Sequence, residues 1–130
     1  MTLYELYKIA DENNVDVYHY PLAPIKSLSV PNTIGIDINQ IETLSEEKEC
    51  LAHELGHCMT DSFYRVNTLE TRGRMEERAN RWAYKTVLPL SELREARQCG
   101  ITEMWELAEY FELPEKFIKK ALAYYKMQSA

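Results

Sequence analysis

The stretch SEEKECLAHELGHCMT, residues 45–60, decides the fold of this chain. Ser45 is a favourable N-cap, and the glutamates that follow it lie near the positive end of a helix dipole. The stretch therefore predicts a helix over about residues 46–60, and the rest of the chain is interpreted around that helix.

The predicted helix contains an HExxH motif, His53-Glu54-Leu55-Gly56-His57. The two histidines are one helical turn apart on the same face, so both imidazoles can reach one metal ion. Glu54 lies about 100° further round the helix, where it can reach a water molecule beside that ion. A catalytic zinc site keeps one position open for water and lowers the pKa of that water to roughly 7. The motif thus predicts Zn²⁺ bound by His53 and His57, with Glu54 as the catalytic general base of a hydrolase.

A third protein ligand must come from outside the motif. The extended pattern HExxHxxGxxH is absent, because Thr60 and Phe63 occupy its glycine and third-histidine positions. Glu76 is the favoured candidate, since it begins a second long helix and Asn80 follows one turn later on the same face. Asn80 is then expected to hydrogen-bond the free ring nitrogen of a ligand imidazole or a backbone group. Other carboxylates stay open as alternatives to Glu76, namely Asp61, Glu70 and Glu77.

The remaining sequence predicts an α+β fold in which a small sheet packs on helices. If the strand formed by Ile34, Ile36 and Ile38 lies at a sheet edge, an extended substrate could pair beside it through main-chain hydrogen bonds. Two other extended segments are expected over residues 15–20 and 25–30, and a loop over residues 61–72. The expected helices, besides the one that carries the motif, cover residues 2–12, 74–87, 91–100 (capped by Ser91), 102–111 (capped by Thr102) and 115–127.

Composition excludes several classes of protein. With 130 residues the chain is long enough for one domain with its own core, and its net charge of −6 argues against a nucleic-acid or anionic-membrane binder. No apolar run is long enough to span a bilayer, and the N-terminal residues lack the pattern of a signal peptide. The three cysteines, Cys50, Cys58 and Cys99, have no metal-site spacing and are expected to be free thiols in a reducing cytoplasm.

Two separated motifs give the chain a family resemblance. LAHELGH at residues 51–57 is followed by SFY at 62–64, by MEERANRWA at 75–83, and by a Leu-Pro pair at 88–89 that ends the helix. In this order they resemble the ImmA/IrrE family of small zinc metallo-endopeptidases, over residues from about 34 to 125. Trp82 departs from the family pattern, in which phenylalanine is more usual, and residues 84–87 are less apolar than the corresponding stretch of the family.

The resemblance implies a fold and a function. The expected fold is a small zincin-like (gluzincin-type) domain over residues 1–130, with Glu76 as the third zinc ligand. The implied setting is a phage or mobile element, and the implied activity is cytoplasmic cleavage of a helix-turn-helix repressor protein, which relieves repression. The alternative is a regulator or antirepressor that binds a repressor without cutting it, with zinc as a structural element.

The residues also indicate roles for two further features. Tyr64 follows the motif helix and is a candidate donor to an oxyanion, although aromatic packing is the favoured role. Residues 101–127 resemble a helix-turn-helix, and the C-terminal segment lacks the basic surplus that a DNA reader needs. We therefore expect these helices to pack or to dock substrate, and DNA is not expected as a partner.

Overall fold

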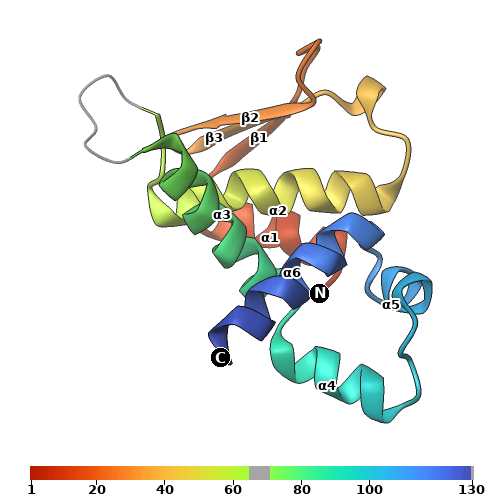
Figure 1. The fold of residues 1–130 in the computed structure, drawn as a ribbon. Coiled ribbons are helices and arrows are strands. Elements are labelled where there is room, and N and C mark those ends of the chain that lie inside the picture. Colours follow the sequence, from red (N-terminus) through yellow and green to blue (C-terminus); the bar gives the residue numbers. More distant parts are fainter. Residues whose placement is uncertain (65–70, 130) are drawn as a thin grey trace.

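The computed structural model describes residues 1–64 and 71–129. Helix α1 (Leu3–Glu12) precedes strands β1 (Asp16–His19), β2 (Ser27–Val30) and β3 (Thr33–Ile36) and the short 3-10 helix η1 (Ile38–Gln40). The helices that follow are α2 (Leu44–Thr60), α3 (Arg72–Val87), α4 (Leu90–Gln98), α5 (Met104–Phe111) and α6 (Glu115–Gln128). This order, shown in Figure 1, confirms the α+β fold with a helical C-terminal half. None of the described helices is long and apolar enough to cross a membrane.

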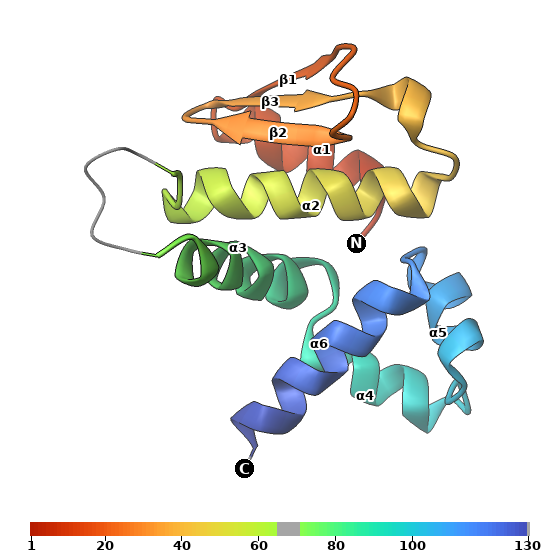
Figure 2. The ribbon, with the colours of Figure 1, turned by 45° about the horizontal axis from the view of Figure 1, so that its top comes forward.

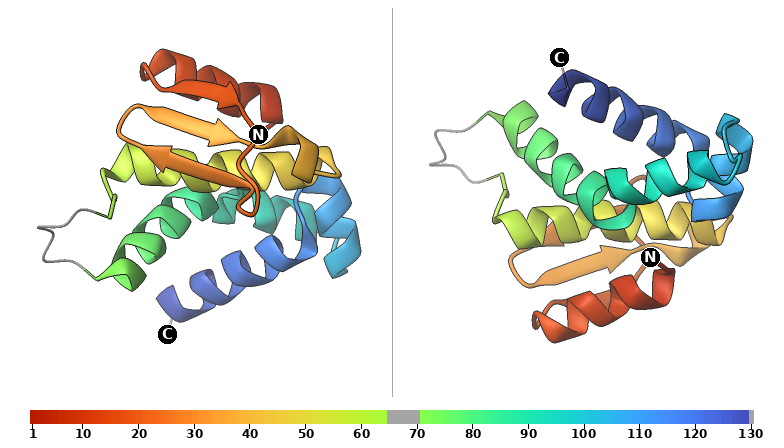
Figure 3. Two further views of the ribbon diagram at one scale, coloured as in Figure 1. Left: turned by 90° about the horizontal axis from the view of Figure 1, so that it is seen from above. Right: turned by 90° about the horizontal axis from the view of Figure 1, so that it is seen from below.

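The elements form layers around α2. The sheet covers one side of this helix and α3 lies on the opposite side, so the motif helix is enclosed between sheet and helix (Figure 2). From above, α1 runs beside the β1 edge of the sheet, whereas the β2 edge faces α3 and α6 (Figure 3). The free β2 edge therefore lies on the side of the sheet where α3 and α6 run.

The strand order corrects one expectation from the sequence. The sheet has the order β1-β3-β2, with β1 parallel and β2 antiparallel to β3. The strand that contains Ile34 and Ile36 is thus the central one and cannot accept a substrate strand, whereas β2 lies at an edge. That strand also ends at Ile36, because the Asp37 side chain accepts hydrogen bonds from the backbone N–H groups of Leu22 and Asn39 and begins η1.

The core lies between the sheet and the first two helices. Ile34 and Ile36 of β3 are completely buried, as are Leu6 of α1 and Leu51 and Leu55 of α2. Burying an aliphatic side chain of this size contributes roughly 1.5–3 kcal/mol, so these contacts fix α2 beneath the sheet. The same buried cluster continues into the C-terminal helices, where its members include Leu88, Leu113 and Ile118.

Several helix starts differ from those expected. Thr43, not Ser45, caps α2 by accepting a hydrogen bond from the Glu46 N–H. Pro89, not Ser91, precedes α4, and Glu103, not Thr102, caps α5 through reciprocal hydrogen bonds with Glu106. Pro89 and Glu103 are not among the preferred N-cap residue types, so packing, rather than capping preference, decides where these two helices begin. Helix α3 also begins earlier than expected, at Arg72 after the Thr71 cap.

The C-terminal segment contains the expected pair of helices, α5 and α6. Phe111 near the end of α5 and Phe117 and Ile118 at the start of α6 are buried, so the two helices share a small core. The helix-turn-helix interpretation of residues 101–127 stays a prediction.

Candidate metal centre

The two motif histidines face α3, and a glycine sets the distance between the helices. A Cβ atom added to Gly56 would lie 2.9 Å from the carbonyl carbon of Ala79, a contact that real Cβ atoms do not make. Ala79 is fully buried at this crossing. Only glycine allows the α2 backbone to approach α3 so closely, and this approach brings Glu76 and Asn80 against the histidines.

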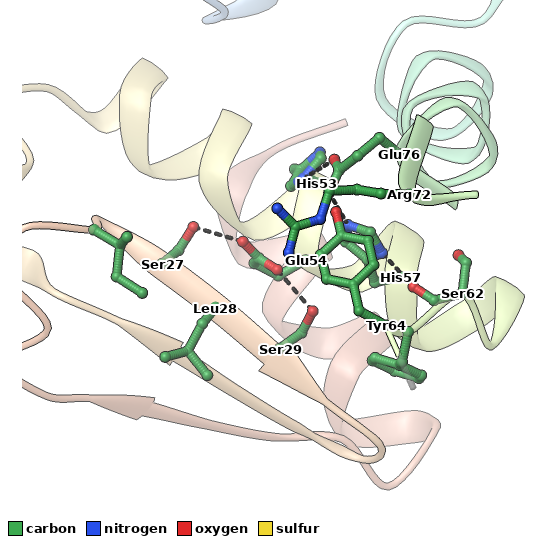
Figure 4. A pocket seen from close by; sticks show the side chains of 12 residues that line it. Ser27, Leu28, Ser29, His53, Glu54, His57, Ser62, Tyr64, Arg72 and Glu76 are labelled. Carbon is green, nitrogen blue, oxygen red and sulfur yellow. Dashed lines mark hydrogen bonds and ion pairs between the residues drawn. The ribbon is translucent and has the colours of Figure 1, made fainter. Parts of the chain in front are cut away.

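Three donor groups converge between α2 and α3. Nε2 of His53 lies 3.0 Å from Oε2 of Glu76, and Nε2 of His57 lies 3.3 Å from Oε1 of the same carboxylate. Ligand atoms of the three residues all lie within 4.8 Å of one another, as expected of side chains that can share one ion. Figure 4 shows the histidines rising from α2 toward the glutamate of α3. Among the residues that the structure describes, these three are the group that could hold a metal.

The alternatives to Glu76 are not in this group. Asp61 and Glu77 are described but do not belong to the cluster. Glu70 lies outside the described residues.

The second nitrogen of each ring has an oxygen partner. Nδ1 of His53 lies 2.9 Å from Oδ1 of Asn80, and Nδ1 of His57 lies 2.5 Å from the main-chain oxygen of Ser62. A carbonyl oxygen can only accept, so each Nδ1 must carry the proton and each Nε2 keeps a free lone pair toward Glu76. This is the tautomer that a metal-ligating histidine needs, and the donor set of two imidazoles and one carboxylate fits Zn²⁺.

Asn80 therefore lies where the sequence predicted it, against a ring nitrogen of His53. The contact of His57 with Ser62 was missed, because it uses a backbone carbonyl that no side-chain pattern reveals. Ser62 is fully buried, and its hydroxyl is hydrogen-bonded to that of Thr60. The chain leaves α2 through the left-handed residue Asp61, which turns the Ser62 carbonyl back toward His57.

The Glu54 side chain points from α2 toward β2 of the sheet. Its side chain is buried, and each carboxylate oxygen accepts a hydrogen bond of 2.7 Å from a serine hydroxyl of β2. The hydroxyl of Ser27 reaches Oε2, and that of Ser29 reaches Oε1, as the dashed lines in Figure 4 show. The two serines were not identified from the sequence, and the only signal was their alternation along an extended segment.

The triad of His53, His57 and Glu76 lines one open cavity of about 640 Å³, and Glu54 lines the same cavity. Tyr64 stands at its wall, about half exposed, with its ring centroid 6.0 Å from that of His57. The guanidinium carbon of Arg72 lies 4.4 Å from the centre of the Tyr64 ring, in cation–π contact. Tyr64 is thus at the cavity, and its role as an oxyanion donor stays a prediction. The other residues that line the cavity are Ile25, Leu28, Phe63 and the two serines of β2, with Ser62.

The sequence of the chain matches the model of a known family. The chain belongs to the IrrE N-terminal-like domain family, Peptidase M78, whose profile matches residues 10–123. The match confirms the ImmA/IrrE resemblance and, with the α+β architecture, the small zincin-like fold. An M78 domain with a His-His-Glu group of this kind indicates a metallopeptidase. No curated protein and no solved structure matches the chain.

A second cavity of the M78 domain, of about 350 Å³, adjoins the triad on the side of α6. The residues that line it include His53, Glu76 and Asn80 and, from α6, Lys116 and Lys120. The C-terminal helices therefore contribute to the surroundings of the site. Cys50 also lines this cavity, and burial raises the pKa of its thiol, which keeps it protonated.

Proposed function

We propose that the chain is a zinc-dependent endopeptidase that cleaves a protein substrate. The observation that carries this proposal is the convergence of His53, His57 and Glu76, with the Glu54 carboxylate beside them in the same cavity. Three protein ligands leave a zinc ion one open position, which is the arrangement of catalytic rather than structural sites.

Each side chain has a distinct task in this reaction. His53, His57 and Glu76 would hold Zn²⁺, which supplies the Lewis acidity that makes water nucleophilic and a peptide carbonyl electrophilic. Glu54 would take a proton from the attacking water and later pass it to the leaving amine. Tyr64 would donate a hydrogen bond to the oxyanion, since it lies at the wall of the same cavity. Asn80 and the Ser62 carbonyl keep the two rings in the required tautomer.

The substrate would bind along β2. This strand is at the edge of the sheet and lines the cavity, so an extended polypeptide can pair with it and present a carbonyl to the site. Main-chain pairing favours a polypeptide over a small molecule or a nucleic acid.

We further propose that the substrate is a helix-turn-helix repressor of a phage or mobile element, cleaved in the cytoplasm. Support for the repressor comes from the ImmA/IrrE resemblance, and support for a reducing compartment comes from Cys50, Cys58 and Cys99, which are all free thiols. The acidic net charge of −6 gives no support for nucleic acid as the partner.

The test is cleavage of a repressor encoded beside this gene. Zinc-loaded protein and its Glu54→Gln variant are each incubated with the repressor, and fragments are identified by mass spectrometry. We expect one or a few defined cuts by the wild type, none by the variant, and equal zinc content in both. Full activity of Glu54→Gln would refute the general-base assignment. Tight binding of the repressor without any cut would instead favour the non-cleaving regulator.

A further inference from the structure

We propose that Ser27 and Ser29 are positioning residues that hold the Glu54 carboxylate in place between the metal centre and the substrate-binding edge of the sheet. The inference rests on the proposed peptidase function. It adds two residues on a strand that carries no recognisable motif.

The first observation is the geometry of the two hydrogen bonds. Each serine hydroxyl donates to a different oxygen of Glu54, and both distances are 2.7 Å. Two donors from fixed points of a strand define both the position and the plane of the carboxylate. Each carboxylate oxygen has two lone pairs, so one on each oxygen stays available to accept the proton of a water molecule.

The second observation is the register of β2 with β3. The Asp37 N–H donates to the Lys26 carbonyl, so these two residues form a hydrogen-bonded pair. Pairs alternate along an antiparallel ladder, and the next residues, Ser27 opposite Ile36 and Ser29 opposite Ile34, are therefore non-hydrogen-bonded pairs. The main-chain N–H and C=O groups of Ser27 and Ser29 consequently point away from β3, toward the free edge.

The same two residues thus face two partners. Their side chains bind the general base, whereas their main-chain groups are the ones that an added substrate strand would pair with. Within residues 1–64 and 71–129 no other strand occupies that edge. Pairing would set the distance between the scissile carbonyl and Glu54, because the substrate main chain and the Glu54 carboxylate would both be hydrogen-bonded to Ser27 and Ser29.

This dual role predicts a separation of kinetic constants. Replacing both serines with alanine removes the hydroxyls and leaves the main chain that binds substrate. We expect Ser27→Ala/Ser29→Ala to lower kcat about 10²-fold, since a misplaced catalytic group costs on this order. We expect KM to stay within roughly threefold of the wild-type value, since uniform binding is retained.

A peptide bond that the zinc-loaded protein cuts is identified in a proteome-derived peptide mixture. The probe is a fluorescence-quenched peptide that carries this bond. Ser27→Thr/Ser29→Thr is the conservative variant, which keeps the hydroxyls and should restore most of kcat. Thr33→Ala is the matched control, because it removes a hydroxyl from the adjacent strand without touching the cavity lining, and it should leave both constants unchanged. A double alanine variant with wild-type kcat, or with a loss confined to KM, would overturn the proposal.

A second readout does not depend on cleavage. Thermal unfolding is compared for the wild type, the double serine-to-alanine variant, Glu54→Ala, and the combination of all three changes, at one zinc concentration. The serine changes should lower the melting temperature by about 4 °C or more when Glu54 is present and by much less when it is absent. Equal shifts of the melting temperature with and without Glu54 would show that the serines do not hold Glu54, and would overturn the proposal. If the wild type cuts no peptide, the peptidase proposal fails, and this comparison still decides whether the serines hold Glu54.

Discussion

Helix α3 packs against its two helical neighbours in different ways. Against α2 it makes a backbone contact at Gly56 and Ala79, where no side chain fills the space. Against α6 it packs aromatic rings, with Tyr84 centred 5.3 Å from Phe117 and 5.7 Å from Tyr124. A contact between backbones cannot adjust by rotating a side chain, whereas packed rings can shift slightly. The metal centre lies at the first contact, where the spacing between the helices is fixed most tightly.

Because the backbone contact cannot adjust, we expect Gly56→Ala to have the largest effect. The new Cβ would meet the carbonyl group of Ala79, which can be relieved only by moving α3, and so we expect a loss of about 3 kcal/mol or more in the free energy of unfolding. Displacing Glu76 should also lower zinc affinity more than 100-fold. Denaturant unfolding and chelator competition measure the two effects, and a Gly56→Ala variant that binds zinc normally would contradict the close-contact argument.

Asn80→Ala tests the support of the metal ligands at the same contact. Removing the partner of His53 Nδ1 frees the ring to rotate and to change tautomer, so zinc affinity should fall about 10- to 100-fold. Because Asn80 is only half-buried, the fold should remain intact, which circular dichroism can check. Unchanged zinc affinity would show that packing alone orients His53.

Tyr125→Phe tests the contact of α3 with α6, because it keeps the ring and removes a hydroxyl that α6 offers to the end of α3. The Tyr125 hydroxyl donates to the main-chain oxygens of Leu88 at 2.9 Å and of Tyr84 at 3.3 Å, near the end of α3. We expect the variant to lose about 1 kcal/mol of unfolding free energy and to bind zinc as the wild type does. A change in zinc affinity here would mean that both contacts, rather than one, control the centre.

Gly73→Ala gives the smallest effect and a matched control for Gly56. Among the residues that the structure describes, the Thr71 hydroxyl, at 4.0 Å, is the one neighbour that a Cβ at Gly73 would meet within that distance. The same substitution should therefore stabilise α3 by about 0.5–1 kcal/mol through helix propensity, with no change in zinc binding. Thermal unfolding measures the gain in stability. A loss of stability comparable to that of Gly56→Ala would show that the cost at Gly56 does not come from its close contact with Ala79.

The sequence predicted what local spacing determines. The HExxH helix, the second helix with Glu76 and Asn80, and the α+β order all follow from periodicity and motif spacing, and the structure has them. The substrate pairing expected beside the Ile34–Ile38 strand required that strand to lie at an edge, and it does not. Strand order depends on how β2 folds back on β3 and not on either strand alone. Ser27, Ser29 and the Ser62 carbonyl were missed for the same reason, since their contacts with α2 residues depend on sheet register and on the turn at Asp61.

We propose that His53, His57 and Glu76 share one zinc ion. Anomalous diffraction at the zinc absorption edge, from crystals of the zinc-loaded chain, tests it most directly. We predict a single peak about 2.0–2.2 Å from Nε2 of each histidine and from a Glu76 oxygen. A zinc peak elsewhere in the molecule, or a Glu76 carboxylate turned away from the two rings, would contradict it.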